Sequence, residues 1–215
     1  SASSASSASS ASSASSASSA VTIAPALGRN SIMQKIDTSN FSSSTKVEAA
    51  LKVVKDMLHT DKTHKAIVFS QYTRMLDIVE WRFVTSGIRV VKLMGYMPLK
   101  ERQSVLNRFR TDPNVPVILM SLKAGGEGLN LQEASHVMCL DPWWNPAVEA
   151  QAINRAHRIG QTRPVTAIRF ITKNSIEERM LQLQEKKKLV FEGTVDGSAA
   201  ALSQLTTEDL QFLFR

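Results

Sequence analysis

The chain has 215 residues, a formal net charge of +7 and a single cysteine. A lone Cys139 excludes an intrachain disulfide, and no apolar run approaches the ~18 residues that a membrane-spanning helix needs. Because no secretory signal is visible either, the sequence predicts an intracellular protein, and its positive charge favours a polyanionic partner.

The first 45 residues differ in composition from the rest of the chain. Residues 1–20 repeat Ser and Ala and carry no side chains able to build a core, so they are predicted to be a disordered leader. The poorly periodic segment 21–45 is interpreted as a linker. About 170 residues remain after it, which suits one well-cored domain.

From residue 45 onward, segments of helical periodicity alternate with short apolar runs. Helices are predicted from near Thr45 as N-cap, over about Tyr72–Thr85 and ended by Gly87, from Pro98 at the first helical position to about Phe109, after Pro146, over Ser175 to about Phe191, and from near Thr206 or Thr207. Strands are predicted at Lys65–Ser70, Ile88–Leu93, Val115–Met120, His136–Leu140 and Val165–Ile171. This alternation predicts an α/β fold with a mostly parallel sheet, helices on both faces and a C-terminal helical extension.

Polar loops follow three of the predicted strands, which end near Phe69, Met120 and Leu140. Ligands gather at the carboxyl ends of parallel strands, so we expect these loops to share one edge of the molecule. Their polar residues could donate hydrogen bonds to phosphates, although each alone is an ordinary loop residue. The residues are Ser70, Gln71, Ser121 and Lys123.

The segment Ala124–Asn130 has three glycines among its seven residues, the last of them Gly128. Glycines let the backbone approach a ligand and point N–H groups at an anion, but a flexible turn has the same composition. No Walker A pattern and no acidic metal-holding motif occurs in the chain. The chain therefore lacks the parts that hold a triphosphate and magnesium.

Two adjacent tryptophans, Trp143 and Trp144, lie between two prolines. One interpretation is core packing of at least one ring, and the other is an aromatic contact with a nucleic-acid backbone. The basic run Lys186–Lys188 is interpreted as a solvated helix face, and Cys139 as a buried, inert thiol in a strand.

The most informative segment, residues 151–161, reads Gln-Ala-Ile-Asn-Arg-Ala-His-Arg-Ile-Gly-Gln. Its spacing places Gln151, Arg155 and Arg158 on one face of a predicted helix. Two guanidinium groups aimed the same way suit a phosphate that gains charge during its transfer. A basic helix face is otherwise simply solvated, so the geometry alone leaves both interpretations open.

Four ordered motifs extend these observations. They are Ile-Val-Phe-Ser-Gln (67–71), Ser-Leu-Lys-Ala-Gly-Gly-Glu-Gly-Leu-Asn-Leu (121–131), Asp-Pro-Trp-Trp-Asn-Pro (141–146) and Gln-x-x-x-Arg-x-His-Arg-Ile-Gly-Gln (151–161). Together they resemble the second lobe of Swi/Snf-type DNA translocases of helicase superfamily two. The segments 43–49 and 205–214 further resemble the RING-finger-bearing branch that acts in nucleotide-excision and post-replication repair. The resemblance implies a RecA-like lobe over 46–173 and a helical extension over 174–215.

The resemblance also implies roles for individual residues. Arg155 and Arg158 would reach the γ-phosphate of ATP, which an amino-terminal lobe would mainly hold together with magnesium, and Gln151 would orient the same site. Gly128 and Asn130 would lie near the ribose and phosphates. The implied contacts with DNA are Ser70, Gln71, Ser121, Lys123 and Trp144. No residue of the chain is expected to bind a metal.

The function implied is that of the second motor lobe of an ATP-dependent double-stranded DNA translocase, acting in DNA repair or chromatin in the nucleus. Its partners would be DNA, the amino-terminal lobe and repair-complex proteins, with no membrane, and the chain alone would turn over negligible ATP. Two departures from the family pattern are Asn154, where Asp is usual, and Glu127, where an apolar residue is common. The alternatives are a non-catalytic DNA- or partner-binding regulatory module and a lobe of a strand-separating helicase.

Overall fold

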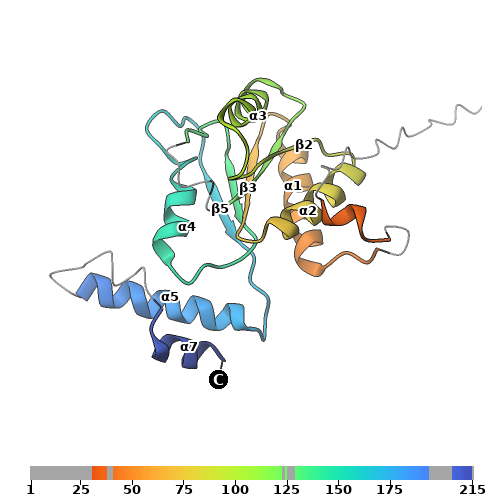
Figure 1. The fold of residues 1–215 in the computed structure, drawn as a ribbon. Helices are drawn as coiled ribbons and strands as arrows, with labels where there is room; N and C mark the ends of the chain where they lie inside the picture. The colour runs from red at the N-terminus through yellow and green to blue at the C-terminus, as the bar shows by residue number, and fades with distance from the viewer. Residues whose placement is uncertain (1–30, 38–40, 123, 125–128, 194–204, 215) are drawn as a thin grey trace, which may run out of the picture.

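The computed structural model describes residues 31–37, 41–122, 124, 129–193 and 205–214, and its fold is drawn in Figure 1. The elements in chain order are η1 (Ile32–Gln34), α1 (Thr45–Thr60), β1 (Ala66–Ser70), α2 (Thr73–Thr85), β2 (Val90–Leu93), α3 (Leu99–Thr111), β3 (Val117–Ser121), β4 (His136–Cys139), α4 (Pro146–Ile153), β5 (Thr166–Arg169), α5 (Ile176–Gly193) and α7 (Thr207–Phe214). The alternation of helices and strands predicted from the sequence is confirmed.

The five strands form one parallel sheet in the order β2-β3-β1-β4-β5. Strand β1 is central, and its last residue, Ser70, is in register with Ser121 at the end of β3. Past the ladder, the N–H of Leu140 donates to the carbonyl of Phe69 at 2.9 Å. The loops after β1, β3 and β4 therefore leave from one edge of the sheet, as predicted.

Alternate residues of the strands build a core on each face of the sheet, which is the two-residue period of a strand covered on both sides. Ile67 and Phe69 of β1 pack with residues of α3 and α4 on one face. Ala66 and Val68 pack with α1 and α2 on the other. Figure 1 shows α1 and α2 on one side of the strands and α4 on the other. The expectation of helices on both faces is confirmed.

Helix α1 forms because its apolar residues repeat at helical spacing and its start is capped. The hydroxyl of Ser44 accepts the N–H of Val47 at 3.3 Å, and Glu48 lies in the first turn, where negative charge is favourable. Ser44, not Thr45, is thus the N-cap, and the prediction was wrong by one residue. The buried residues are Val47, Ala50, Leu51, Val54 and Met57.

Two further helix boundaries, the start of α3 and the end of α2, were also predicted. Pro98 precedes α3 as its N-cap residue, with an extended ψ of 151°, so the first helical position is Leu99 and the prediction was one residue early. Gly87 follows α2 with φ of +82°, a conformation that costs glycine little, and its N–H donates to Val84 at 3.0 Å. The predicted role of Gly87 in ending this helix is confirmed.

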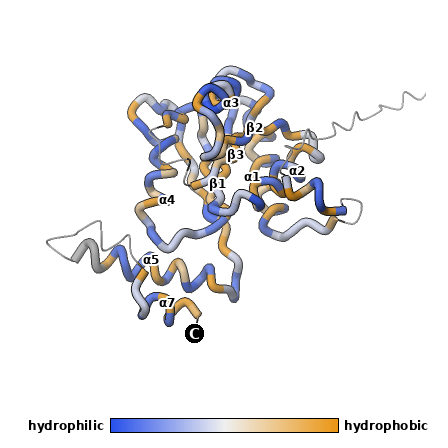
Figure 2. Tube along the Cα trace, viewed as in Figure 1, coloured by the Kyte–Doolittle hydropathy of each residue, from blue (hydrophilic) through white to orange (hydrophobic). Residues whose placement is uncertain are grey.

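The C-terminal helices α5 and α7 pack against each other beside the sheet. Apolar and polar segments alternate along α5 in Figure 2, and Leu183 is buried. The capping box of α7 is reciprocal: Thr206 Oγ1 accepts the N–H of Asp209 at 3.1 Å and Asp209 accepts the N–H of Thr206 at 3.0 Å. Among the described residues, every helix is too short or too polar to cross a bilayer.

Candidate functional site

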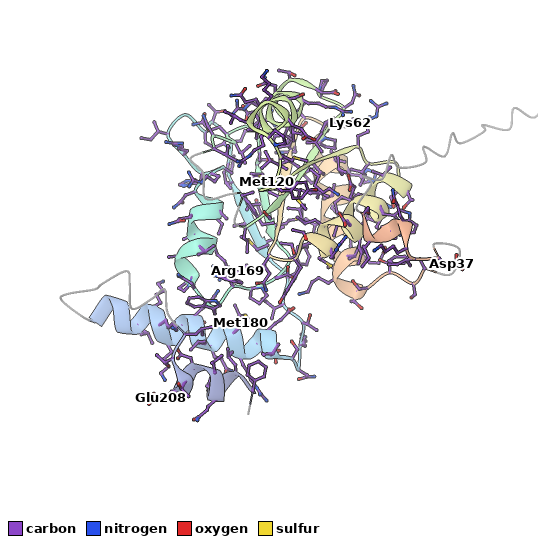
Figure 3. The ribbon with its side chains drawn as sticks, viewed as in Figure 1. Asp37, Lys62, Met120, Arg169, Met180 and Glu208 are labelled. Carbon is purple, nitrogen blue, oxygen red and sulfur yellow. The ribbon has the colours of Figure 1, made fainter. Side chains whose placement is uncertain are left out.

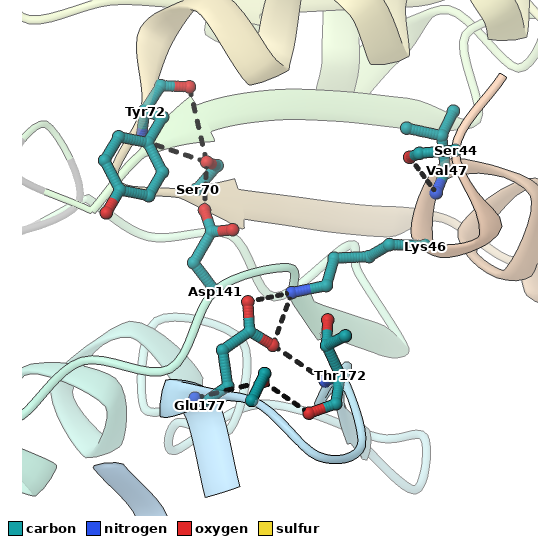
Figure 4. A network of polar contacts seen from close by, with 9 residues as sticks. Ser44, Lys46, Val47, Ser70, Tyr72, Asp141, Thr172 and Glu177 are labelled. Carbon is teal, nitrogen blue, oxygen red and sulfur yellow. Dashed lines mark hydrogen bonds and ion pairs between the residues drawn. The ribbon is translucent and has the colours of Figure 1, made fainter. Parts of the chain in front are cut away.

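Ser70 and Asp141 join the ends of β1 and β4 at the carboxyl edge of the sheet. The Ser70 hydroxyl donates to Oδ2 of Asp141 and accepts the N–H of Tyr72 at 3.0 Å (Figure 4). Burial raises the pKa of the Asp141 carboxyl, although the Ser70 hydrogen bond and the Lys46 charge act in the opposite direction. The pair fixes the start of the loop that carries Gln71.

Two of the predicted DNA contacts are Ser70, which belongs to this pair, and Gln71, which follows it in the chain. Ser70 is fully buried, so a phosphate reaches its hydroxyl only if the bond to Asp141 opens. Gln71 is half-buried, and its backbone N–H donates to the Asp141 carboxylate. Asp141 thus organises both residues, a role that the sequence analysis did not assign. The contacts of Ser70 and Gln71 with DNA stay predictions.

Ser121, at the end of β3, is also buried, and its hydroxyl accepts the N–H of Ala124 at 3.2 Å. This bond turns the chain at the start of the glycine-rich segment. Lys123 and Gly128 lie outside the described residues, so their predicted roles remain untested.

Helix α4 ends at Ile153, before both arginines of the segment 151–161. The expected single helix carrying Gln151, Arg155 and Arg158 on one face is therefore wrong. The N–H of Arg155 donates to the carbonyl of Ala152, three residues back, at 3.2 Å. The carbonyl of Arg155 accepts the N–H of Leu131 at 3.1 Å, so a remote loop takes the acceptor that a continued helix would use.

The arginines lie instead in a turn that we define as the arginine turn, residues 154–161. Gly160 has φ of +101°, and a Cβ there would lie 3.0 Å from Nε2 of Gln132. The side-chain amide of Gln161 donates to the carbonyls of Gln132 at 2.8 Å and Ala134 at 3.0 Å. The Gly-Gln ending of the motif therefore serves to attach this turn to residues 131–134.

The predicted catalytic residues differ in exposure. Arg158 and Gln151 are exposed, and Arg155 is half-buried. Asn130 is also exposed, and its side-chain amide donates to Gln132 at 3.1 Å, while the other end of Gln132 donates to the carbonyl of Ile159. The structure thus brings Asn130 close to the arginine turn, and the roles of these residues toward ATP stay predictions.

The tryptophans are divided between the two interpretations. The ring of Trp143 packs against the core, so core packing of one ring is confirmed. The backbone N–H of Trp143 donates to the buried carboxylate of Glu149 at 2.7 Å. Trp144 is half-buried, and Nζ of Lys187 lies 5.3 Å from its ring centroid. Lys187 also contacts Asp209 at 3.0 Å with 10% of its side chain exposed, so its predicted outward orientation is wrong.

Cys139 is buried beside Glu149, and burial raises the pKa of its thiol to about 12. A thiol this hard to ionise is a poor nucleophile, which confirms the inert interpretation. Within the part of the chain that the structure describes, no three His, Cys, Asp or Glu side chains are grouped to hold a metal ion.

Comparison with known proteins identifies relatives of this chain. Residues 46–160 match the helicase conserved C-terminal domain. The chain is 48% identical over 184 residues to the ATP-dependent helicase rhp16 of Schizosaccharomyces pombe, covering 86% of this chain and 21% of that protein. It is 42% identical over 186 residues to the DNA repair protein RAD5B of Arabidopsis thaliana, covering 86% of this chain and 14% of that protein.

A solved structure is also similar. The crystal structure of the C-terminal part of the Fun30 ATPase domain aligns with a TM-score of 0.68 and 33% identity, covering 83% of this chain and 55% of that one. These matches confirm the RecA-like fold and the resemblance to the second lobe of Swi/Snf-type helicases of the repair branch. The chain spans about a fifth or less of the length of the curated relatives it matches.

Proposed function

The chain belongs to the helicase conserved C-terminal domain family, and on this premise we propose that it is the second motor lobe of an ATP-dependent double-stranded DNA translocase. ATP would bind between this lobe and an amino-terminal lobe. Closure of the two lobes would bring the arginine turn against the phosphates, and opening after hydrolysis would shift the grip on DNA.

One observation carries the proposal: the arginine turn is anchored by backbone and amide contacts while the side chain of Arg158 is exposed. Arg158 is exposed; before it the carbonyl of Arg155 accepts the N–H of Leu131, and after it Ile159 and Gln161 both bond to Gln132. A guanidinium on an anchored turn is preorganised for a phosphate that a second lobe delivers. Arg155 and Gln151 would complete the same site.

The residues present fit the phosphates of ATP better than they fit its metal. Guanidinium groups match phosphate oxygens in charge and geometry, and Asn130 adds polar groups beside the turn. Gly128 would let the backbone approach the nucleotide. Within the described residues no carboxylate cluster suits Mg²⁺, so the amino-terminal lobe would hold the metal that neutralises the phosphates.

DNA would lie along the loops at the carboxyl edge. Gln71, Ser121, Lys123 and Trp144 would follow the backbone of one strand, and Ser70 would join them once its bond to Asp141 opens. Such contacts read phosphates and not bases, so binding should tolerate any sequence and weaken steeply with salt. With DNA repair proteins among its relatives, the lobe would act in the nucleus alongside repair-complex proteins.

The decisive experiment supplies an amino-terminal lobe of a repair relative in trans and measures DNA-stimulated ATP hydrolysis. Arg158→Ala is expected to lower kcat by about 10³–10⁵, as for other arginine fingers. The matched control is Arg163→Ala, because Arg163 is also exposed but donates to Thr63 at the other edge of the sheet. Strong turnover by the chain alone, abolished in Arg158→Ala, would refute the split site. Equal activity of Arg158→Ala and wild type would favour the non-catalytic binding module.

A further inference from the structure

Glu149 is a fully buried carboxylate in the first turn of α4. Oε1 accepts the N–H of Trp143 at 2.7 Å and the side-chain amide of Gln184 at 2.9 Å, and Oε2 lies 2.9 Å from Nε of Arg169. The hydrogen-bond donors come from the Trp143 loop and from α5, and the ion-pair partner Arg169 comes from β5. Figure 3 shows Arg169 where the sheet faces α5.

A buried charge is costly unless it is both hydrogen-bonded and paired with an opposite charge, so this carboxylate favours the one arrangement in which all three elements are in place. The Gln184 amide also donates to the carbonyl of Trp143. One turn further along α5, Lys187 covers the ring of Trp144. One face of α5 therefore contacts both the loop that carries Trp143 and Trp144 and the start of α4.

We propose that Glu149 and Gln184 are positioning residues that couple the C-terminal helix α5 to α4 and, through it, to the arginine turn. Helix α4 has 8 residues, and the turn begins directly at its end. A displacement at its first turn is transmitted along so short a rigid element, because interiors are close-packed. The assignment of these arginines to ATP rests on the proposed function, whereas the coupling itself does not.

Hydrogen–deuterium exchange of this chain tests the coupling without ATP. Gln184→Leu keeps the side-chain volume and leaves Glu149 with Trp143 and Arg169. We expect exchange across residues 150–161 to rise about tenfold, the loss that one charge-assisted bond predicts. The matched control is Glu177→Gln, which weakens the attachment of α5 to Lys46 without touching Glu149. Unchanged exchange in Gln184→Leu, or an equal rise in the control, overturns the proposal.

A second variant, Glu149→Gln, keeps one acceptor oxygen and removes the charge beside Arg169, and its arginine turn should also exchange faster. In the two-lobe ATPase assay, Gln184→Leu should lower kcat about tenfold while the KM for DNA stays within about twofold, since a phosphate-positioning defect acts on the chemical step. A rise in KM alone would contradict a positioning role. If even the wild-type lobes hydrolyse no ATP, the proposed function fails, and the exchange measurement still decides the coupling.

Discussion

Helices α1 and α4 cover opposite faces of one sheet and are held in different ways. Helix α1 has 16 residues and buries five apolar side chains, so it is stabilised by its own pattern. Helix α4 has 8 residues and buries Glu149 and Ala152, and the turn that follows it bonds to residues 131–134. Helix α1 depends on apolar burial, whereas the short α4 and the arginine turn depend on remote hydrogen bonds as well as on the core packing of Ala152 and Ala156.

The largest effect should come from breaking the apolar side. Leu51 of α1 is 3% exposed, and Leu51→Ala should lower the free energy of unfolding by about 2–5 kcal/mol through lost burial and a cavity. Denaturant unfolding followed by circular dichroism measures it. The control Lys52→Ala changes an exposed neighbour and should stay within about 0.5 kcal/mol. If the two variants unfold alike, α1 is not held by its buried face.

The next effect should come from detaching the arginine turn. Gln161→Ala leaves the carbonyls of Gln132 and Ala134 without their donor, which should cost about 1–3 kcal/mol. Unlike Leu51→Ala, it should raise hydrogen exchange in the turn well above that in α1. Gln103→Ala, at an exposed position of α3, is the matched control. Equal exchange in the turn of Gln161→Ala and wild type would show that other contacts hold it.

This contrast also explains what the sequence could predict. The order of strands and helices, the burial of Cys139 and the shared edge of the loops follow from local periodicity and from the rules of parallel sheets, and all are confirmed. Even the wrong assignments, Thr45 as an N-cap and Pro98 as a first helical residue, missed by one position. Local patterns decide these features because each segment carries its own signal.

The site was harder to predict because its partners are remote in sequence. The spacing of Gln151, Arg155 and Arg158 matches a helix, but the N–H of Leu131 bonds the carbonyl of Arg155 and no local pattern encodes that bond. Gln184 donates to the carboxylate of Glu149, 35 positions away. Lys187 lies over the ring of Trp144, which is also remote in sequence. The spacing of residues reports which face of a helix a side chain would occupy, and not which tertiary hydrogen-bond donor ends the helix.

A smaller effect compares the two helix caps. Ser44→Ala removes the acceptor for Val47, and Asn145→Ala removes the acceptor that lies 2.9 Å from the N–H of Ala147 in α4. Each should cost about 1 kcal/mol in thermal or denaturant unfolding. Only Asn145→Ala should also speed exchange in the arginine turn, because α4 is short and ends where the turn begins. Faster exchange of the turn in Ser44→Ala would contradict this difference between the two faces.

The smallest effect concerns pH and the attachment of α5 and α7. Burial raises the pKa of Glu177, but hydrogen bonds from Lys46 and Thr172 outweigh it, and the pKa lies below its ordinary 4.5. Burial also raises the pKa of Asp209, but the hydrogen bonds from Thr206 and Lys187 outweigh this effect. The pKa of Asp209 therefore lies below its ordinary 3.8. Both carboxylates therefore stabilise the fold when charged.

A carboxyl whose pKa is lower in the folded than in the unfolded chain adds stability that is fully present above its ordinary pKa and is lost as the pH falls through the folded value. We thus expect no loosening of α5 and α7 between pH 7 and about 5, and faster exchange there once the pH drops below the ordinary carboxyl range. Glu48 of α1, whose pKa is lowered by its hydrogen bond with Arg82, loses its charge in the same acidic range. Helix α1 should nevertheless stay protected because its apolar face does not titrate. Exchange measured at pH 7, 5 and 3.5 distinguishes the two, and simultaneous loosening of α1 and α5 would show that charge, and not burial, governs both.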